Sequence, residues 1–578
     1  MVGGGNNDIE NSLQNIKKNT LELSFGVFFD GTLNSIANID ERKNYENFLR
    51  KVDAYTLIAN LDVFVERAKK ILDNTSHYES YRSEYTNVAR SYKCFKNKSG
   101  KIIPIYIEGI GTKPRQIGRQ IDFTQDLKEK KLSYDEYDRG TLSLNKFMED
   151  NDDFISCSDD QLASALGVGI FGVKKKVESA CEKIYNAIKN INLKKYDELK
   201  LDLYVFGFSR GSAAARCFSS CIRHRIGRTK VDCSFKSDFM GVMNITSVKE
   251  KLAKENKYRT SLKYDWLDLY FKNPYVCNQI DLWIPKIKVK FLGLYDTVSS
   301  YGAYFNDDVE ELSLTIDSKN VENVYQICAG DEYRKNFALT DIASAGVKGD
   351  SIIIPGSHSD IGGGYSHNMK ESLKNFFVFT SGYKGKDMLH NEGWFNSGES
   401  ERIISNLYSV IPFLLMKDKI VGRDEVFNKE EINSYVLPTS KKLNIDGIWH
   451  IYSKELCDFY NKLKIGGYNA YYRIEGDTIK NLSKEELDLS NYVSRMNSRI
   501  QYLKLEDAPE EAIKEFEKNY EVSNKKLNEV KQKRSNYDEE LLRKIRHDFL
   551  HLSAKSKELE DLFVNGSNKN NNRTVIKG

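Results

Sequence analysis

The stretch Leu201–Arg216, with the sequence LDLYVFGFSRGSAAAR, constrains the fold of this chain more than any other segment. Its first residues are mostly apolar, as in a buried strand, and its last residues are small and favour a helix. Between them lies a G-x-S-x-G sequence centred on Ser209. In this strand–turn–helix context the turn strains the serine backbone, and the residues two before and two after the serine must be small. We therefore predict that Ser209 is an exposed nucleophile rather than a buried serine in an ordinary turn.

The bulk composition indicates a folded protein and limits the classes of partner that can be predicted for it. The chain has 578 residues, of which 29% are charged, and its formal net charge is only +4. Such a length suggests roughly two to four domains. A balance this close to neutral gives no basis for predicting a nucleic-acid partner. None of the nine cysteines lies in a CxxC pair, so we expect a reducing compartment during synthesis and predict neither a metal site nor a cofactor.

The N-terminal sequence lacks the apolar segment of a secretory signal peptide. The longest apolar runs, Ala165–Val173 and Val410–Met416, are much shorter than a membrane-spanning helix. We therefore expect a protein that is made in the cytoplasm and that needs a dedicated machine if it is exported.

Apolar strand patterns alternate with helical stretches along the first two thirds of the chain. The predicted strands are Leu21–Asp30, Lys101–Glu108, Leu201–Phe206, Lys286–Tyr295 and Ser351–Ile354. Strands separated by helices favour a parallel sheet with helices packed on it. The sequence therefore predicts an α/β fold with an α/β-hydrolase-like core.

The domain organisation follows from where these patterns begin and end. We predict a loose lead-in over residues 1–20, a catalytic core over 21–370 with an insertion at about 217–285, and a mostly helical accessory region over 371–578. Within that last region, Ile403–Met416 is expected to be helical. Asp507–Phe563 is charged and periodic enough for a helical hairpin or coiled-coil arm, and the tail from Asn565 is expected to be mobile.

A serine nucleophile needs a base to accept its proton and a carboxylate to orient that base. His358 follows a predicted strand and precedes three glycines, which makes it the preferred base among eight histidines. Asp296 also follows a predicted strand, where open α/β sheets place their ligands. The order Ser209, Asp296, His358 is that of α/β-hydrolases. Asp360 is the alternative carboxylate, or else a residue that pins the glycine loop.

The negative charge that develops on the substrate needs two backbone amides. We expect one from Arg210, directly after the nucleophile, and one from Gly31 or Thr32 after the first strand, with Asp30 in support. The sequence Asp30-Gly31-Thr32 also occurs in the D-x-D-G-T motif of haloacid-dehalogenase phosphotransferases. That alternative is disfavoured because Phe28 replaces the nucleophilic aspartate.

Several short motifs occur together in one order along the chain. They are FDGTLN at 29–34, TNV at 86–88, EGIGT at 108–112, GFSRG at 207–211, YDTV at 295–298 and PGSHSDIGGGY at 355–365. In this combination the chain resembles the α/β-hydrolase family that includes the GxSxG class of type VI secretion lipase effectors. Two further segments, AGDEYRKNFAL at 329–339 and FLHLS at 549–553, also resemble the same family. The FLHLS match keeps His551 open as an alternative base.

The resemblance implies a phospholipase of the A1 or A2 type that acts on bacterial membrane phospholipids through Ser209, Asp296 and His358. It also implies export by a type VI system into the periplasm of target bacteria. The expected partners are spike or adaptor proteins of that system and a cognate immunity protein.

Two other functions remain open from the sequence. One is the same chemistry on an ester that is not a phospholipid, and the other is a binding or membrane-disrupting toxin without hydrolase activity. Residues 230–285 and Leu407–Met416 are candidate membrane contacts, although packed core helices are the preferred interpretation of both.

Overall fold

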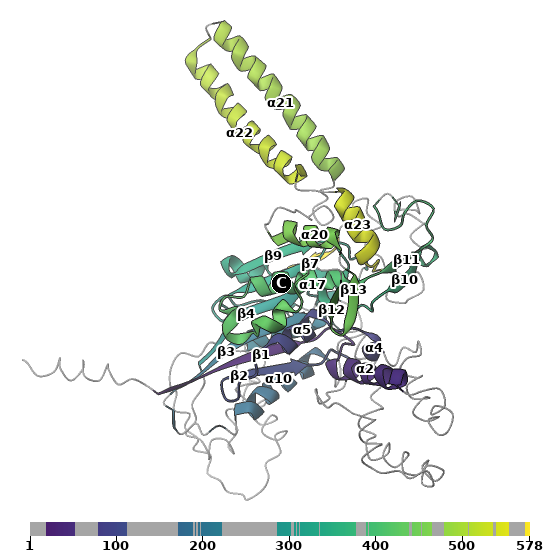
Figure 1. The fold of residues 1–578 in the computed structure, drawn as a ribbon. Coiled ribbons are helices and arrows are strands. Elements are labelled where there is room, and N and C mark those ends of the chain that lie inside the picture. The colour runs from purple at the N-terminus through teal and green to yellow at the C-terminus, as the bar shows by residue number, and fades with distance from the viewer. Residues whose placement is uncertain are drawn as a thin grey trace, which may run out of the picture.

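The computed structural model describes residues 19–51, 79–112, 172–221, 286–376, 389–437, 442–464, 479–535, 539–553 and 573–578, apart from short gaps inside these ranges. Within them, helices cover both faces of a central sheet, and a long helical hairpin stands away from it (Figure 1). The α/β class predicted from alternating strands and helices is confirmed.

Six parallel strands form the central sheet in the order β2-β1-β3-β4-β7-β9. The strands are β1 (Thr20–Phe29), β2 (Ile102–Ile107), β3 (Glu198–Phe208), β4 (Lys286–Tyr295), β7 (Val324–Ala329) and β9 (Gly349–Ile354). All five strands expected from the sequence are present. The sixth, β7, was missed because it is short and buried on both faces, so it shows no alternation of apolar and polar residues.

The order of the strands locates a crevice at the carboxyl edge of the sheet. The chain passes outward from β1 to β2, then returns to β3 and continues through β4, β7 and β9 on the other side. In open parallel sheets, ligands bind outside the strand ends where the order reverses in this way. Asp30 and Ser209 follow β1 and β3, the two strands that flank the reversal.

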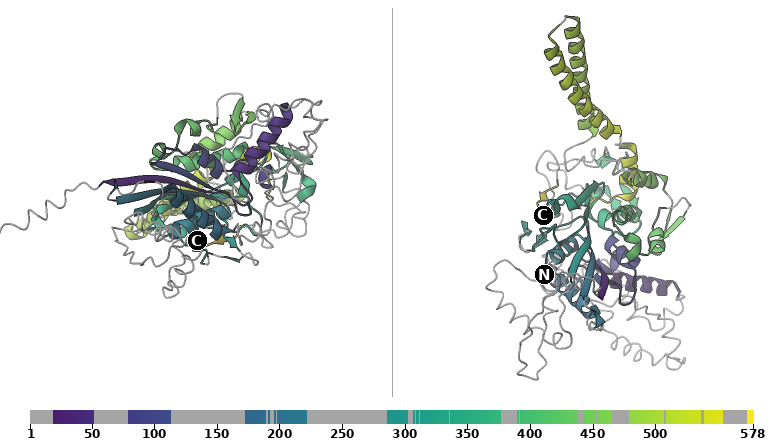
Figure 2. Two further views of the ribbon diagram at one scale, coloured as in Figure 1. Left: turned by 90° about the horizontal axis from the view of Figure 1, so that it is seen from below. Right: turned by 90° about the vertical axis from the view of Figure 1, so that its left-hand side faces the viewer.

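Alternating side chains of the strands pack into two separate clusters. Phe25 and Val27 of β1 pack in one cluster with two helices, whereas Phe28 packs on the opposite face with two others. These are α10 (Val173–Ile188) and α11 (Arg210–Cys221) on the first face, and α5 (Asn87–Cys94) and α17 (Val410–Asp418) on the second. Figure 2 shows helices on both sides of the sheet.

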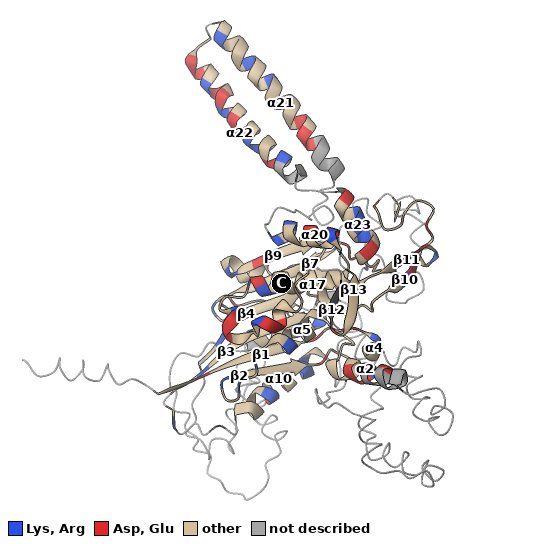
Figure 3. Ribbon diagram, in the orientation of Figure 1, with Lys and Arg blue, Asp and Glu red and all other residues tan. Residues whose placement is uncertain are grey.

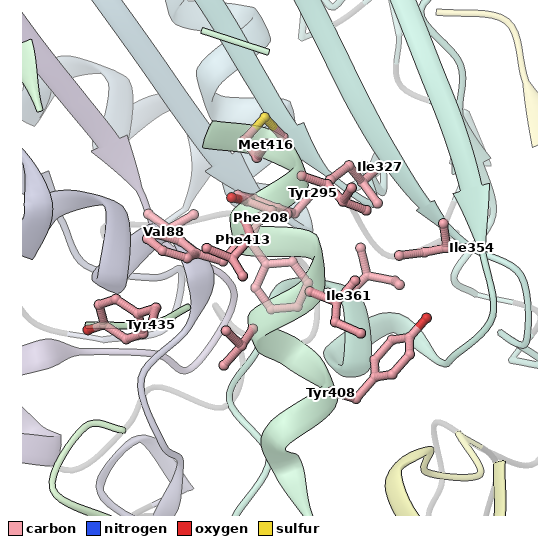
Figure 4. Packing of buried hydrophobic residues seen from close by; sticks show 14 of the residues in the cluster. Val88, Phe208, Tyr295, Ile327, Ile354, Ile361, Tyr408, Phe413, Met416 and Tyr435 are labelled. Atoms are coloured by element: carbon pink, nitrogen blue, oxygen red, sulfur yellow. The ribbon is translucent and has the colours of Figure 1, made fainter. Parts of the chain in front are cut away.

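The second cluster reaches the strand ends that carry the candidate site. Figure 4 shows part of it, with Phe413 and Met416 of α17 packed over Phe208 and Tyr295 at the ends of β3 and β4. Residues 407–416 are buried in this cluster, which supports the core interpretation of that segment over membrane contact. The helix expected over Ile403–Met416 is partly wrong, because Ile403 lies in strand β11 (Glu401–Ile404), which pairs with β10 (Met369–Ser372).

The helical hairpin lies earlier in the chain than the sequence suggested. It consists of α21 (Ile479–Leu505) and α22 (Glu510–Ser535), whereas α23 (Glu539–Phe549) packs back on the core. Residues of both signs of charge are spread along the two long helices (Figure 3). The expected arm, Asp507–Phe563, begins at the turn between the two helices and so left out α21.

Some expected boundaries fall outside the described residues. Residues 1–18 and 222–285, which hold most of the expected lead-in and insertion, are not described, and α11 continues to Cys221 beyond the expected start of the insertion. The tail expected to be mobile from Asn565 is ordered at 573–578, where β14 (Val575–Ile576) pairs with β8 (Leu339–Thr340). No helix within the described ranges has both the length and the apolar character needed to cross a membrane.

The remaining elements are short or peripheral. They are α2 (Ile36–Lys51), α4 (Glu79–Arg82), β5 (Ser300–Tyr301), β6 (Asn306–Asp307), η6 (Ala343–Lys348), α15 (His358–Gly362), η8 (Asn406–Ser409), α18 (Arg423–Val426), α19 (Lys429–Asn433), β12 (Lys442–Ile445), β13 (Ile448–Ile451) and α20 (Lys454–Lys464).

The close approach of α11 to β1 predicts that Gly211→Ala is destabilising. A Cβ at this position would lie 2.3 Å from the Asp30 carbonyl oxygen and 2.5 Å from that of Phe29. We expect a loss on the order of 2 kcal/mol from this overlap, although alanine is the better helix former. Thermal and urea unfolding measure it. Gly100→Ala is the control, because a Cβ at Gly100 would meet no atom within 4 Å. Any loss of stability in that variant comes from the positive φ of 70° and not from steric overlap. A Gly211→Ala protein as stable as the parent would contradict the packing argument.

Candidate active site

Ser209 occupies the tight turn expected between β3 and α11, but it is only 5% exposed, so the expectation of an exposed serine is wrong. Its φ of 60° lies in the left-handed region, and its amide donates to the Tyr295 carbonyl oxygen at 3.0 Å. A Cβ on Gly207 would lie 2.5 Å from the Gly211 carbonyl oxygen, and one on Gly211 would meet β1. The small residues around the serine are therefore required by the close packing of strand and helix.

Asp296 follows β4 and shares this unusual backbone geometry. Its φ is 45°, and its amide donates to the Ile327 carbonyl oxygen of the neighbouring strand β7 at 2.8 Å. The side chain is fully buried, and its Oδ1 accepts a hydrogen bond of 2.8 Å from the Ala329 amide. Left-handed backbone at a residue other than glycine is held only where surrounding contacts enforce it, and such residues are concentrated at functional sites.

His358 is the first residue of α15, which begins after β9. Its Nδ1 lies 2.5 Å from Asp296 Oδ2, and both side chains are buried. Because an ionised carboxylate only accepts hydrogen bonds, Nδ1 carries the proton of the neutral ring and Nε2 does not. His358 Nε2 has no hydrogen-bond partner among the described residues. The sequence-predicted histidine and aspartate are thus brought together with the nitrogen of a potential base left unpaired.

The histidine also lies against the turn that carries the serine. Its ring centroid is 4.7 Å from that of Phe208, the residue before Ser209, and 4.9 Å from that of Phe337. Within the described part of the chain, no hydrogen bond joins Ser209 Oγ to His358. Catalytic hydrogen bonds are often long without a substrate and shorten in the substrate complex.

Burial dominates the electrostatics of the pair. Burial lowers the pKa of His358, and the hydrogen bond and negative charge of Asp296 oppose this effect. For Asp296, burial alone would raise the pKa, but the positive charge of Arg573 and the hydrogen bond with His358 hold it well below the usual range. The aspartate is therefore ionised, and the histidine is neutral near pH 7.

In the loop after β1, one of the two amides expected to bind the oxyanion is already hydrogen-bonded within the protein. The Gly31 amide donates to its neighbour Asp30 Oδ1 at 2.7 Å, so it is already engaged. The Thr32 amide has no hydrogen-bond partner among the described residues. Arg210, the other residue expected to contribute an amide, is the first residue of α11.

Asp30 holds this loop through a buried network. It accepts hydrogen bonds from Thr86 Oγ1 at 2.6 Å and from the Tyr106 hydroxyl at 2.5 Å, in addition to the Gly31 amide. Burial raises the pKa of Asp30 to about 6, and these hydrogen bonds oppose the rise. The side chain thus ties the loop to α5 and β2, a supporting role.

Asp360 is not directed toward His358, contrary to the geometry expected if it were the alternative carboxylate. That expectation assumed an extended backbone, but residues 358–362 form helix α15, in which residues two apart lie on different sides. Asp360 Oδ2 accepts from the Ser357 amide at 2.9 Å, and Oδ1 lies 2.7 Å from His551 Nδ1. Asp360 therefore pins the start of the glycine loop and pairs with a different histidine.

His551, the alternative base, is buried and stacked on Tyr365 with a ring distance of 3.9 Å. Its amide and Nδ1 both bind Asp360. Two histidine–aspartate pairs are therefore buried within the described ranges, and of these two only the one with Asp296 lies against the Ser209 turn.

Arg573 is the residue that sequence reasoning missed. Its guanidinium contacts both oxygens of Asp296, at 2.6 and 2.9 Å, although the two residues are 277 positions apart. Nothing in the low-complexity tail signals such a contact. Among the described residues, no group of three or more histidine, cysteine, aspartate or glutamate side chains is arranged to hold a metal ion.

Comparisons with known proteins identify the family of this chain. Residues 71–379 match the model of the catalytic domain of the Tle1-like phospholipase effectors of type VI secretion systems. No curated protein matches the chain. A structure of the Tle1 effector bound to the VgrG spike from the type VI secretion system is 18% identical, with a TM-score of 0.37 over 77% of this chain and 79% of that one. An uncharacterized protein from Pseudomonas aeruginosa is 14% identical, with a TM-score of 0.34 over 94% of this chain and 66% of that one. The family match spans more than half of the sequence, and the chain therefore belongs to the Tle1-like family of type VI phospholipase effectors.

Proposed function

We propose that this phospholipase effector is a serine hydrolase of the A1 or A2 type, with Ser209 as nucleophile, His358 as base and Asp296 as the carboxylate that orients the base. The observation that carries the proposal is the buried 2.5 Å contact between His358 Nδ1 and Asp296 Oδ2, which lies beside the strained turn of Ser209. A base oriented in this way, next to an elbow serine, is the arrangement that acyl hydrolysis requires.

The proposed reaction has two halves. Ser209 Oγ attacks the acyl carbonyl carbon while His358 Nε2 takes the hydroxyl proton, and the amides of Arg210 and Thr32 stabilise the oxyanion. His358 then gives this proton to the departing glycerol oxygen of the lysophospholipid. A water molecule, deprotonated by His358, then attacks the acyl-enzyme, and His358 gives this proton to Ser209 Oγ as the bond to the fatty acid breaks. Asp296 stabilises the imidazolium in both halves and stays ionised.

The biological setting follows from the family. We propose that the protein acts on bacterial phospholipids after export by a type VI system into the periplasm of a target cell. A spike or adaptor protein would carry it, and a cognate immunity protein would protect the producer.

Product analysis on defined phospholipids tests the chemistry. With lipids labelled at the sn-1 or the sn-2 chain, the parent protein should release one labelled fatty acid, and the chain released distinguishes A1 from A2. Ser209→Ala should lower hydrolysis by about 10⁴-fold or more, because the covalent route is lost. Hydrolysis at the parent rate in Ser209→Ala would overturn the proposal. Cleavage of soluble esters without any cleavage of phospholipids would favour the broader esterase function.

The acid side of the pH profile tests the role of His358. The neutral imidazole is the active form, so kcat/KM should fall as the pH drops through the pKa of His358. Burial lowers that pKa, so the activity on a soluble ester should persist below the usual histidine value of about 6.5. A profile that loses activity well above pH 6.5 would argue against His358 as the base.

Variants of His358 and His551 distinguish the base from its alternative. His358→Ala should lower kcat/KM by about 10⁴-fold. His551→Ala removes a partner of Asp360 and should reduce thermal stability while it retains at least about a tenth of the activity, because its ring is held by Asp360. A folded His551→Ala protein that is as inactive as His358→Ala would instead make His551 the base.

A further inference from the structure

The segment 573–578 docks beside the candidate triad through backbone hydrogen bonds. Strand β14 pairs in parallel with β8, and the amides of Leu339 and Asp341 donate to the carbonyl oxygens of Thr574 and Ile576, both at 2.9 Å. Strand β8 is itself joined to the residue after Asp296, because the Thr340 amide donates to the Thr297 carbonyl oxygen at 2.9 Å. A short chain of backbone contacts therefore fixes this segment relative to the aspartate.

This anchoring delivers the Arg573 side chain into the interior. The residue is only 4% exposed, so its charge is removed from water and needs close partners. Its Nε donates to the Phe337 carbonyl oxygen at 2.7 Å, and its Nη1 also reaches that of Ala329 at 3.3 Å. The two terminal nitrogens donate one hydrogen bond to each oxygen of the Asp296 carboxylate. Lysine cannot reproduce this bidentate geometry.

Arg573 completes the hydrogen bonding of Asp296. Oδ1 accepts from the Ala329 amide and Arg573 Nη1, whereas Oδ2 accepts from His358 Nδ1 and Arg573 Nη2. With two donors on each oxygen, the carboxylate cannot rotate without breaking several buried hydrogen bonds. The plane of the carboxylate, and with it the direction of Oδ2 toward His358, is therefore fixed.

We infer that Arg573 is a positioning residue of the triad, which acts through Asp296 by fixing the orientation and the negative charge of that carboxylate. The inference rests on the proposed serine-hydrolase function. It also links catalysis to the docking of residues 573–578, since the segment that carries Arg573 is held by β8.

The positive charge has a second effect on the base. Because Arg573 pairs with Asp296, we expect its charge to offset part of the attraction between that carboxylate and protonated His358. Two other charged groups act on His358: Glu332, whose Oε2 accepts from the His358 amide at 3.2 Å and whose charge raises the pKa of His358, and Arg334, whose charge lowers it. Removing the charge of Arg573 while keeping Asp296 ionised should raise the pKa of His358, and the acid limb of the pH profile should then move to higher pH. A purely structural role of Arg573 would change the amount of folded protein and leave the limb in place.

The test uses steady-state hydrolysis of a soluble ester by the full chain with Arg573→Gln and Arg573→Lys. Arg573→Gln should lower kcat by about 10- to 100-fold with little change in KM, and should move the acid limb up by about one pH unit. Arg573→Lys keeps the positive charge but loses the bidentate contact. The acid limb of its pH profile should therefore stay in place, and its kcat should lie between those of the parent protein and Arg573→Gln. Lys577→Gln removes an exposed charge from the same segment and should behave as the parent protein.

A double-mutant cycle makes the coupling specific. In an Asp296→Asn background, Arg573→Gln should cause little further loss, because the group it positions is already gone. Full additivity of the two losses would overturn the inference, as would folded Arg573 variants with parent kcat and pH profile. Thermal unfolding shows that each variant is folded, and Arg573→Lys serves as the probe if Arg573→Gln does not fold.

Ser209→Ala separates the inference from the function on which it rests. If Ser209→Ala still hydrolyses the ester, the serine mechanism itself is wrong. If Ser209→Ala is inactive and Arg573→Gln matches the parent protein, only the positioning role is wrong.

Discussion

The buried carboxylate of Asp296 is the interaction on which the candidate site depends. An ionised group with no exposed surface is tolerated only where its charge and lone pairs are met by partners. Asp296 meets this requirement with a backbone amide of Ala329, the imidazole of His358 and the guanidinium of Arg573. These partners come from three distant segments of the chain. The carboxylate therefore joins the sheet, the histidine helix and the docked segment 573–578 in one place.

The same edge of the sheet holds two strained residues next to each other. Ser209 and Asp296 both have left-handed backbones, and the amide of the serine donates to the carbonyl oxygen of Tyr295, which directly precedes the aspartate. Each such residue costs on the order of 1–3 kcal/mol, so the surrounding packing must enforce it. The two apolar clusters on either face of the sheet supply that packing. The strain directs both side chains at the carboxyl edge.

Local patterns were sufficient for much of the architecture and failed where burial or a turn hid the signal. Five of six core strands and the elbow followed from apolar runs and small residues, which report on local backbone geometry. Strand β7 was missed because it is buried on both faces, and the expected arm included only the second helix of the hairpin. The side chain of Asp360 was expected to point the same way as that of His358, as it would on an extended backbone. It does not, because residues 358–362 form a five-residue helix.

The sequence by itself determined the α/β class, the elbow at Ser209 and the presence of Asp296 and His358 after strands, because each is encoded within a dozen neighbouring residues. Only the tertiary structure decided which groups meet. It paired His358 with Asp296 and His551 with Asp360, engaged the Gly31 amide with Asp30, and brought Arg573 to a carboxylate 277 positions away. Contacts of this kind depend on how separate segments pack, and no local period or spacing records them.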